Sequence, residues 1–335
     1  MAALRYPSGQ QAVALAWLAA LAAVALLAPY LPLPYGPALP DLAHVAEPPF
    51  RAGSAHWLGT DAQGQDVLAN LVFGTRTVVL LTLPAAVLAT ALGAVAGGAA
   101  GFWGKVRLPG PAWALVVGLA WWGLRLPGAG LGLGVAGAAA VALAWAARAG
   151  RLARLPTWPL PLDGLVLGTA ALLGAVPRLV LVAAVASTGV TPIGLLALLV
   201  VSSWPDAARL VRAQMLRVRA LPFVEAAVAA GVPPARVWWR HAMPHAMQPL
   251  RAAFPLSLAG LVGLETTLSF LGIGLPPEVP SWGRMLNSVR LELDAWWLAA
   301  FPALALLGTL LALQVLARSV SSTSVAALKR QPIRN

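Results

Sequence analysis

The feature that most constrains this chain is a series of long apolar runs, the first of which, residues 12–33, has no charged side chain. A helix needs about 20 mostly apolar residues to cross the hydrocarbon core of a bilayer. The composition agrees, because 59% of the residues are hydrophobic and 10% are charged, against about 25% charged in a typical soluble domain. The mean hydropathy is +0.79. The sequence therefore predicts an all-α polytopic membrane protein.

Eight stretches are apolar enough to count as spans. They are residues 12–33, 77–103, 112–126, 129–147, 164–186, 190–208, 250–272 and 296–317. The first stretch has a second interpretation, a cleaved signal peptide, because small residues follow it. We favour a retained span, since only Arg5 precedes the apolar run and further spans follow it.

The placement of basic residues predicts which side each loop faces, because lysine and arginine collect in the cytoplasmic loops of membrane proteins. This rule puts both termini, with the tail 319–335, and residues 209–249 in the cytoplasm. Residues 34–76 and 273–295 then lie outside. Of the 23 basic residues, six lie outside or within spans: Arg51, Arg76, Arg125, Arg178, Arg284 and Arg290. The net charge of +12 thus reflects membrane orientation, and we expect no nucleic-acid partner.

The stretch 105–160 holds two of the apolar runs, with basic clusters at both of its ends. Both ends are therefore expected in the cytoplasm. Residues 112–147 then form either a hairpin that crosses twice or a re-entrant hairpin, since the first limb is short for a span. We favour two crossings.

One compact basic element, residues 223–249, separates two apolar blocks. Pro222 and Glu225 are typical of a helix start, and Gly231 of a helix end. Pro233 and Pro234 can begin a second short helix. Without further information this is an amphipathic helix at the membrane surface, rich in arginine and tryptophan.

This element carries a resemblance to a known family. Its "EAAVAAGVPPARVWWRHAMP" resembles the E-A-A, three residues, glycine signature of ABC-importer permeases, and His241 stands where general members have isoleucine. Three more blocks resemble dipeptide, oligopeptide and nickel permeases of the C type: "HWLGTDAQGQDVLANLVFGTRTVVLL", "SWPDAARLVRAQML" and "ETTLSFLGIGLPPEVPSWGRML". Gln65 and Asn70 replace arginines of the family pattern, and Thr266 and Thr267 replace alanines.

The resemblance implies a domain organisation. Residues 56–104 and 161–318 would form the permease transmembrane domain, whose five spans make the six-helix core of a type I ABC importer together with the first span. Residues 1–55 would supply the first span and an external segment, and residues 105–160 would be an inserted hairpin, for about eight spans in all.

The resemblance also implies a function, a permease subunit of an ATP-driven importer in the plasma (inner) membrane. Its partners would be a second permease, two ATP-binding subunits and a solute-binding protein. The chain has no G-x-x-x-x-G-K-[S/T] loop, so ATP and magnesium are expected in the partner subunits and no cofactor in this chain. The residues expected to couple to the ATPase are Glu225, Ala226, Ala227, Gly231, Arg236, Arg240, His241 and Pro244. The two arginines have a simpler interpretation, placement on the positive inner side.

Three ionisable residues fall inside predicted spans, where an unpaired charge is costly. Asp206 lies near the predicted inner end of its span and is interpreted as a solvated charge. Arg178 and Glu265 are deeper, about 21 and 22 Å from the cytoplasmic ends of their spans. At similar depth they would pair or face one polar cavity, as candidate pore residues. Alternatively, each side chain extends separately to the membrane surface.

Other functional classes find less support. The histidines show no metal signature: His241 and His245 lack a third ligand, and His44 and His56 stand alone in the external segment. No catalytic or metal site is therefore predicted. A membrane enzyme would need paired intramembrane carboxylates or a serine–histidine set at one depth, and a channel would need a filter motif. We expect di- or oligopeptides as cargo, with nickel or another small solute as the alternative.

Overall fold

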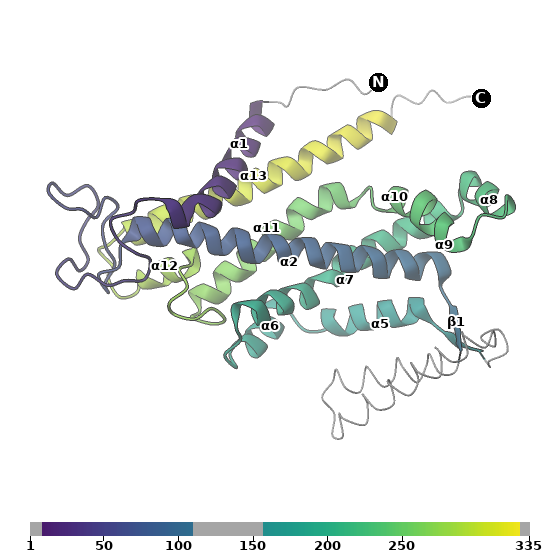
Figure 1. Ribbon diagram of the computed structural model, residues 1–335, viewed down its shortest axis with the longest axis horizontal. Helices are drawn as coiled ribbons and strands as arrows, with labels where there is room; N and C mark the ends of the chain where they lie inside the picture. Colours follow the sequence, from purple (N-terminus) through teal and green to yellow (C-terminus); the bar gives the residue numbers. More distant parts are fainter. Residues whose placement is uncertain (1–8, 110–156, 329–335) are drawn as a thin grey trace.

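The structure is a computed structural model that describes residues 9–109 and 157–328. The chain forms an elongated bundle of helices (Figure 1). The elements are α1 (Gly9–Leu27), η1 (Ala28–Tyr30), α2 (Val67–Trp103), β1 (Val106–Pro109), β2 (Thr157–Leu160), α5 (Leu162–Gly174), α6 (Arg178–Ala186), α7 (Pro192–Arg219), α8 (Pro222–Ala229), α9 (Pro234–Arg236), the π-helical turn η3 (Val237–Ala242), α10 (Met243–Ala246), α11 (Leu250–Phe270), α12 (Trp282–Ser288) and α13 (Trp297–Leu328).

The described helices confirm the six-span core. Five of them are long and apolar enough to cross a membrane, and a bent pair, α5 with α6, makes a sixth. The predicted hairpin 112–147 falls outside the described residues. The last helix, α13, continues to Leu328, so the tail predicted from residue 319 begins as part of that helix. The bundle has two ends, which we call the α8 end and the α12 end after the short helices found there (Figure 1).

The span predicted at 164–186 is not one continuous helix, although its two helices together are long and apolar enough to form a span. The helices α5 and α6 meet at a bend of 78°. Pro177 causes the break, because a residue that precedes proline is forced out of the helical conformation and proline has no N–H to donate. Pro177 itself is extended, with φ −53° and ψ 127°.

The centre of the bundle is the long contact between α2 and α7, and small residues make it close. Gly93, Gly97 and Gly101 lie four residues apart on α2. A methyl group added at Gly93 would lie 2.4 Å from the Trp204 carbonyl oxygen, and one at Gly97 would lie 2.1 Å from that of Ala208. The backbones therefore nearly touch, as in helix pairs of membrane proteins that use glycine every fourth residue.

The two short strands lie at the base of the predicted insertion. β1 and β2 pair antiparallel, with Val106 opposite Leu160. Beside them, the N–H of Asp163 donates to the carbonyl of Gly104 at 3.0 Å, and the Asp163 carboxylate pairs with Arg212 of α7. The chain thus leaves α2 and enters α5 at nearly the same place, as expected if residues 105–160 are inserted between them.

Candidate functional site

The basic element predicted from the sequence folds as a compact cap at the α8 end. α8 stops at a Schellman motif: the N–H of Val232 donates to Ala227 and the N–H of Gly231 to Val228, with φ +75° at Gly231. Glycine adopts this left-handed conformation without the strain that a Cβ would add. Pro234 then starts α9, as predicted.

One face of the cap is fixed to the membrane helices. Val224, Val237 and Met243 are buried in a cluster with Val211, Met215 and Val218 of α7. The Trp238 ring lies 5.0 Å from that of Trp103 at the end of α2, and Arg219 donates to the Phe102 carbonyl at 2.9 Å. The cap is therefore packed against both α2 and α7.

The other face of the cap is open. Glu225, Ala226, Gly231, Arg236, Arg240 and Pro244 are exposed, and Ala227 and His241 are partly buried. Apolar side chains accompany them, among them Trp239, 59% exposed, and Val228, 55% exposed. Beside Glu225 lies a hollow of about 410 Å³, lined by Phe102, Arg219, Val224, Val228 and Ala229 as well.

The predicted pair of Arg178 and Glu265 does not form. Arg178 is the first residue of α6 and pairs with Asp206 of α7, which also accepts a bond from Arg209 at 3.1 Å. The depth calculation assumed an unbroken helix, and the bend at Pro177 removes that assumption. Asp206, interpreted from the sequence as a solvated charge, is half-exposed and also forms ion pairs with Arg178 and Arg209.

Glu265 lies elsewhere, enclosed between helices. Its side chain has no exposed surface, and one carboxylate oxygen accepts a 2.7 Å bond from Ser269. α12 covers it closely, since a methyl group at Gly283 would lie 2.2 Å from the Thr266 carbonyl oxygen. Glu265 is thus enclosed within the single chain and does not face Arg178, and its role as a pore residue stays a prediction.

The α12 end contains a polar cavity of about 340 Å³ between the segment before α2 and the start of α12. Asp61, Gln65, Asn70, Ser269 and Arg284 are among its lining residues. Gln65 and Asn70, the two replacements of family arginines, bond to each other at 3.0 Å. Burial raises the pKa of Asp61, whose carboxylate accepts bonds from the N–H groups of Gln63 and Gln65. Burial also lowers the pKa of Arg284, which donates to three backbone carbonyls.

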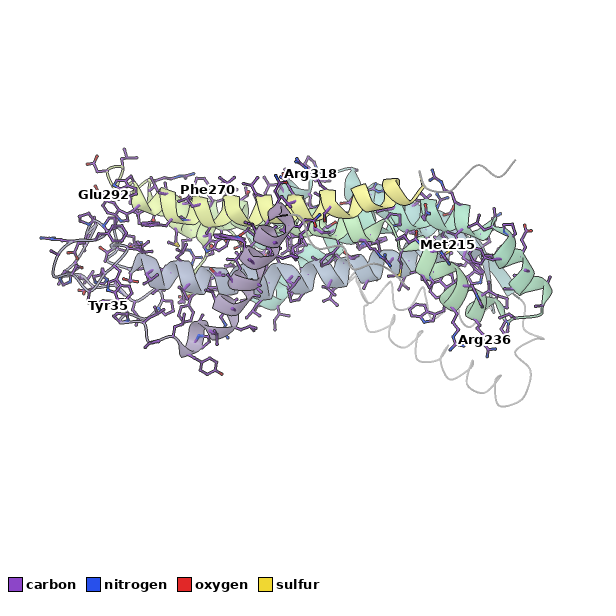
Figure 2. The ribbon with its side chains drawn as sticks, turned by 90° about the horizontal axis from the view of Figure 1, so that it is seen from above. Tyr35, Met215, Arg236, Phe270, Glu292 and Arg318 are labelled. Atoms are coloured by element: carbon purple, nitrogen blue, oxygen red, sulfur yellow. The ribbon has the colours of Figure 1, made fainter. Side chains whose placement is uncertain are left out.

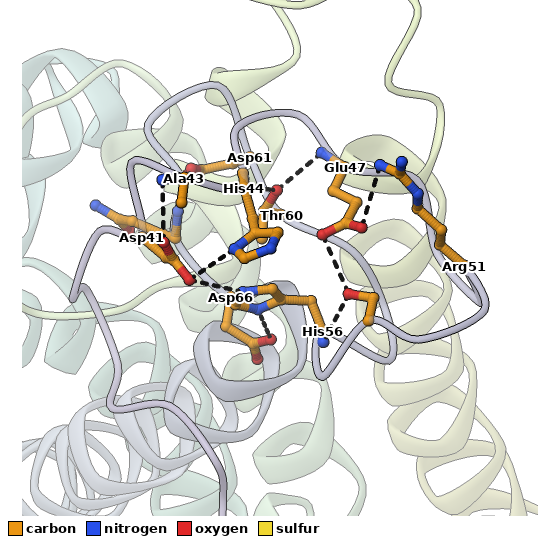
Figure 3. Close-up of polar contacts among 11 residues, drawn as sticks. Asp41, Ala43, His44, Glu47, Arg51, His56, Thr60, Asp61 and Asp66 are labelled. Carbon is orange, nitrogen blue, oxygen red and sulfur yellow. Dashed lines mark hydrogen bonds and ion pairs between the residues drawn. The ribbon is translucent and has the colours of Figure 1, made fainter.

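The histidines of the segment before α2 are not isolated, contrary to the prediction. His44 and His56 converge on Asp41 (Figure 3). The two histidines are twelve positions apart, so no local spacing revealed the contact. The two ends of the segment are held together by a long-range backbone bond, in which the N–H of Asp41 donates to the Gly64 carbonyl at 2.8 Å.

Residues 67–323 match the family model of the binding-protein-dependent transport system inner membrane component. The chain belongs to this family. The match covers α2 to α13, and with it both the cap and the α2–α7 contact of this permease. The resemblance stated from four sequence blocks is thereby confirmed.

Curated relatives carry matching descriptions. A putative peptide permease protein of Brucella suis is 30% identical over 287 residues, which cover 84% of this chain and 75% of the relative. An inner membrane ABC transporter permease protein of Escherichia coli is 31% identical over 261 residues, 76% of this permease and 60% of the relative. A probable peptide ABC transporter permease of Sinorhizobium fredii is 38% identical over 144 residues, 42% of this permease and 50% of the relative. The matches thus span about half to three quarters of these relatives.

Proposed function

We propose that this chain is the membrane-spanning permease subunit of an ATP-driven importer of di- or oligopeptides. It would act with a second permease, two ATP-binding subunits and a solute-binding protein, and would itself do no covalent chemistry. The family description and the relatives named as peptide permeases support this proposal. Nickel or another small solute is the alternative cargo, and uptake of labelled dipeptides, oligopeptides and Ni²⁺ by the assembled complex distinguishes them.

The cap is the proposed docking site for an ATP-binding subunit, and its two-faced construction carries the proposal. A coupling element needs an accessible face for the partner and a rigid attachment to the helices that move. Glu225, Arg236 and Trp239 are exposed, whereas Val237 and Met243 are buried against the bundle. Glu225 and Arg236 offer charges of both signs, which give a partner orientation and specificity.

The membrane orientation follows from the same element. Arg217 and Arg219 end α7, and Arg236 and Arg240 follow in the cap, so basic residues gather at the α8 end. By the positive-inside rule this end faces the cytoplasm, where ATP-binding subunits would meet it. The α12 end then faces the solute-binding protein.

The pore face is proposed to include Arg178, Asp206 and Arg209. Asp206 lies 14 residues after Pro192, about 21 Å along a helix of about 42 Å, and so at membrane depth. The side chains of Arg178 and Asp206 are 36% and 52% exposed in the single chain. Charged groups at this depth face other protein or water and not lipid. The second permease or the translocation path therefore covers this surface.

Charge reversal tests the coupling role. Glu225→Lys should abolish ATP-dependent uptake and reduce co-purification of the ATP-binding subunits, while the amount in the membrane is unchanged. Gly231→Pro should do the same, because proline cannot adopt the positive φ found there. Glu292→Lys, a matched reversal at the opposite end of the bundle (Figure 2), should still co-purify with the ATP-binding subunits. Normal uptake by both cap variants would refute the docking site.

A further inference from the structure

The segment between η1 and α2 gathers two imidazoles and a carboxylate at one point (Figure 3). A ring nitrogen of His44, Nδ1, lies 2.9 Å from Asp41 Oδ2, and His56 Nε2 lies 3.5 Å from the same oxygen. One ligand atom from each of the three residues lies within 4.8 Å of the other two. Asp41 and His44 are neighbours three residues apart, and the fold of the segment brings His56, 15 residues from Asp41, to the same point.

His56 is held in one orientation. Its side chain is 1% exposed, and the Tyr35 ring stacks on it with 3.9 Å between ring centroids. Asp66, the N-cap residue of α2, accepts a bond from His56 Nδ1 at 2.9 Å through Oδ2, while its Oδ1 accepts the N–H of Ala69. A carboxylate on one imidazole nitrogen fixes the ring and makes the other nitrogen a better metal ligand, as in many protein zinc sites.

The carboxylate of Asp41 is positioned in a similar way. Its Oδ1 accepts the N–H of Ala43 at 3.0 Å, which leaves Oδ2 to face both histidines. The backbone of Asp41 lies against Gly64, where a methyl group would be 2.3 Å from the Asp41 carbonyl oxygen. The loop that carries His44 is fixed as well, because Thr60 donates to the His44 carbonyl at 2.5 Å.

These contacts bring three potential metal ligands to one position. His56 Nε2 lies 3.5 Å from Asp41 Oδ2, and His44 Nδ1 lies 2.9 Å from the same oxygen. A cation among the three atoms would be bound by two imidazole nitrogens and one carboxylate oxygen. Four ligands about 2.0–2.1 Å from a tetrahedral ion are roughly 3.4 Å apart. The Asp41–His56 distance already matches this value, and the Asp41 and His44 atoms, 2.9 Å apart, would separate slightly to admit the ion.

We propose that Asp41, His44 and His56 bind a divalent transition-metal ion of the Zn²⁺ class, with Asp66 orienting His56. Two imidazole nitrogens and one carboxylate oxygen suit this class and not Mg²⁺ or Ca²⁺, which prefer oxygen ligands. Water would occupy a fourth position on the exposed side, next to His44. The bound ion would tie the segment before α2 to the first turn of that helix. This inference does not rest on the proposed transport function.

Metal titration of the full chain tests the site. The protein, purified through a tag without histidine and stripped with chelator, is titrated with ZnCl₂ by calorimetry and with CoCl₂ by visible absorption. One Zn²⁺ per chain and a tetrahedral Co²⁺ spectrum are expected. His44→Ala should weaken Zn²⁺ binding at least about tenfold, and Asp66→Asn, which keeps an N-cap oxygen, about 10–100-fold.

The other exposed histidine provides the control. His245 lies in α10, at the opposite end of the bundle, and His245→Ala should bind Zn²⁺ as the wild type does. Zn²⁺ should also raise the melting temperature of the wild type and of His245→Ala, but not that of His44→Ala. If the wild type binds no Zn²⁺, or if His44→Ala binds it with wild-type affinity, the metal site is refuted.

Discussion

Replacing Gly97 by alanine should separate the two central helices of the permease. The new methyl carbon would lie 2.1 Å from the Ala208 carbonyl oxygen and 2.7 Å from its carbonyl carbon. An ordinary contact needs about 3.4 Å or more, so α2 and α7 must move apart by about 1 Å along their closest contact. Neither neighbour is a flexible side chain that could turn away.

The expected cost follows from overpacking. Extra atoms in a close-packed interface typically cost about 1–3 kcal/mol. For a protein of this size we expect the melting temperature to fall by several degrees. Tryptophan fluorescence or size-exclusion chromatography of heated samples in detergent measures it. Gly93→Ala, whose methyl group would lie 2.4 Å from the Trp204 carbonyl oxygen, should behave alike. The double variant should lose less stability than the sum of the two single losses, because the first methyl group already separates the helices.

A glycine with free space around it supplies the matched control. Gly260 of α11 has nothing within 4 Å of an added methyl group. Gly260→Ala should therefore be neutral or stabilising, since alanine favours a helix by up to about 1 kcal/mol over glycine. If Gly97→Ala melts at the same temperature as Gly260→Ala, the close backbone contact is not present and the reasoning fails.

Three further predictions concern charge and the insertion. Arg178→Gln or Asp206→Asn should lower the free energy of unfolding by less than about 1 kcal/mol, because the ion pair is half exposed. Either change should nevertheless reduce peptide uptake more than tenfold. Normal uptake would show that this pair is not part of the pore face. Asp61→Asn should raise the melting temperature at pH 7, because burial raises the pKa of Asp61 and its carboxylate form is disfavoured in the fold. The gain in melting temperature should shrink as pH falls towards 4, because the Asp61 carboxylate is then protonated, first in the folded chain and then in the unfolded chain. A gain that does not change with pH would contradict this prediction. Deletion of 106–160 with a two-glycine joint should leave membrane insertion and uptake intact, whereas loss of the protein from the membrane would make this stretch part of the core.

Hydropathy and breaker residues predicted much of the fold. Uncharged runs located the six-span core, and Pro222, Gly231 and Pro234 marked the ends of the cap helices correctly. Pro177 indicates a bend before Arg178 in the sequence, but the apolar run around it favoured the prediction of one continuous helix. The glycines spaced four apart on α2 were also readable in the sequence, because that spacing favours close helix pairs.

The side-chain partners could not be predicted, because they depend on how distant segments approach. Arg178 was matched to Glu265 by depth alone, while the bend turns it towards Asp206. His44 and His56 met only through the path of an irregular loop. Local periodicity contains no information about such a path, since it reports the side of a helix and not the partner across it.

The helix α2 has a mechanical consequence of its own. Its 37 residues span about 55 Å, from its N-cap residue Asp66 to the contact between Trp103 and Trp238 at the other end. Because one continuous helix joins these points, a tilt of about 5° at one end displaces the other by about 5 Å. A spectroscopic label beside Asp66 would therefore report movements of the Trp238 end without altering any residue at the Trp238 end. The sequence has no cysteine, so a single thiol can be introduced beside Asp66 to carry the label.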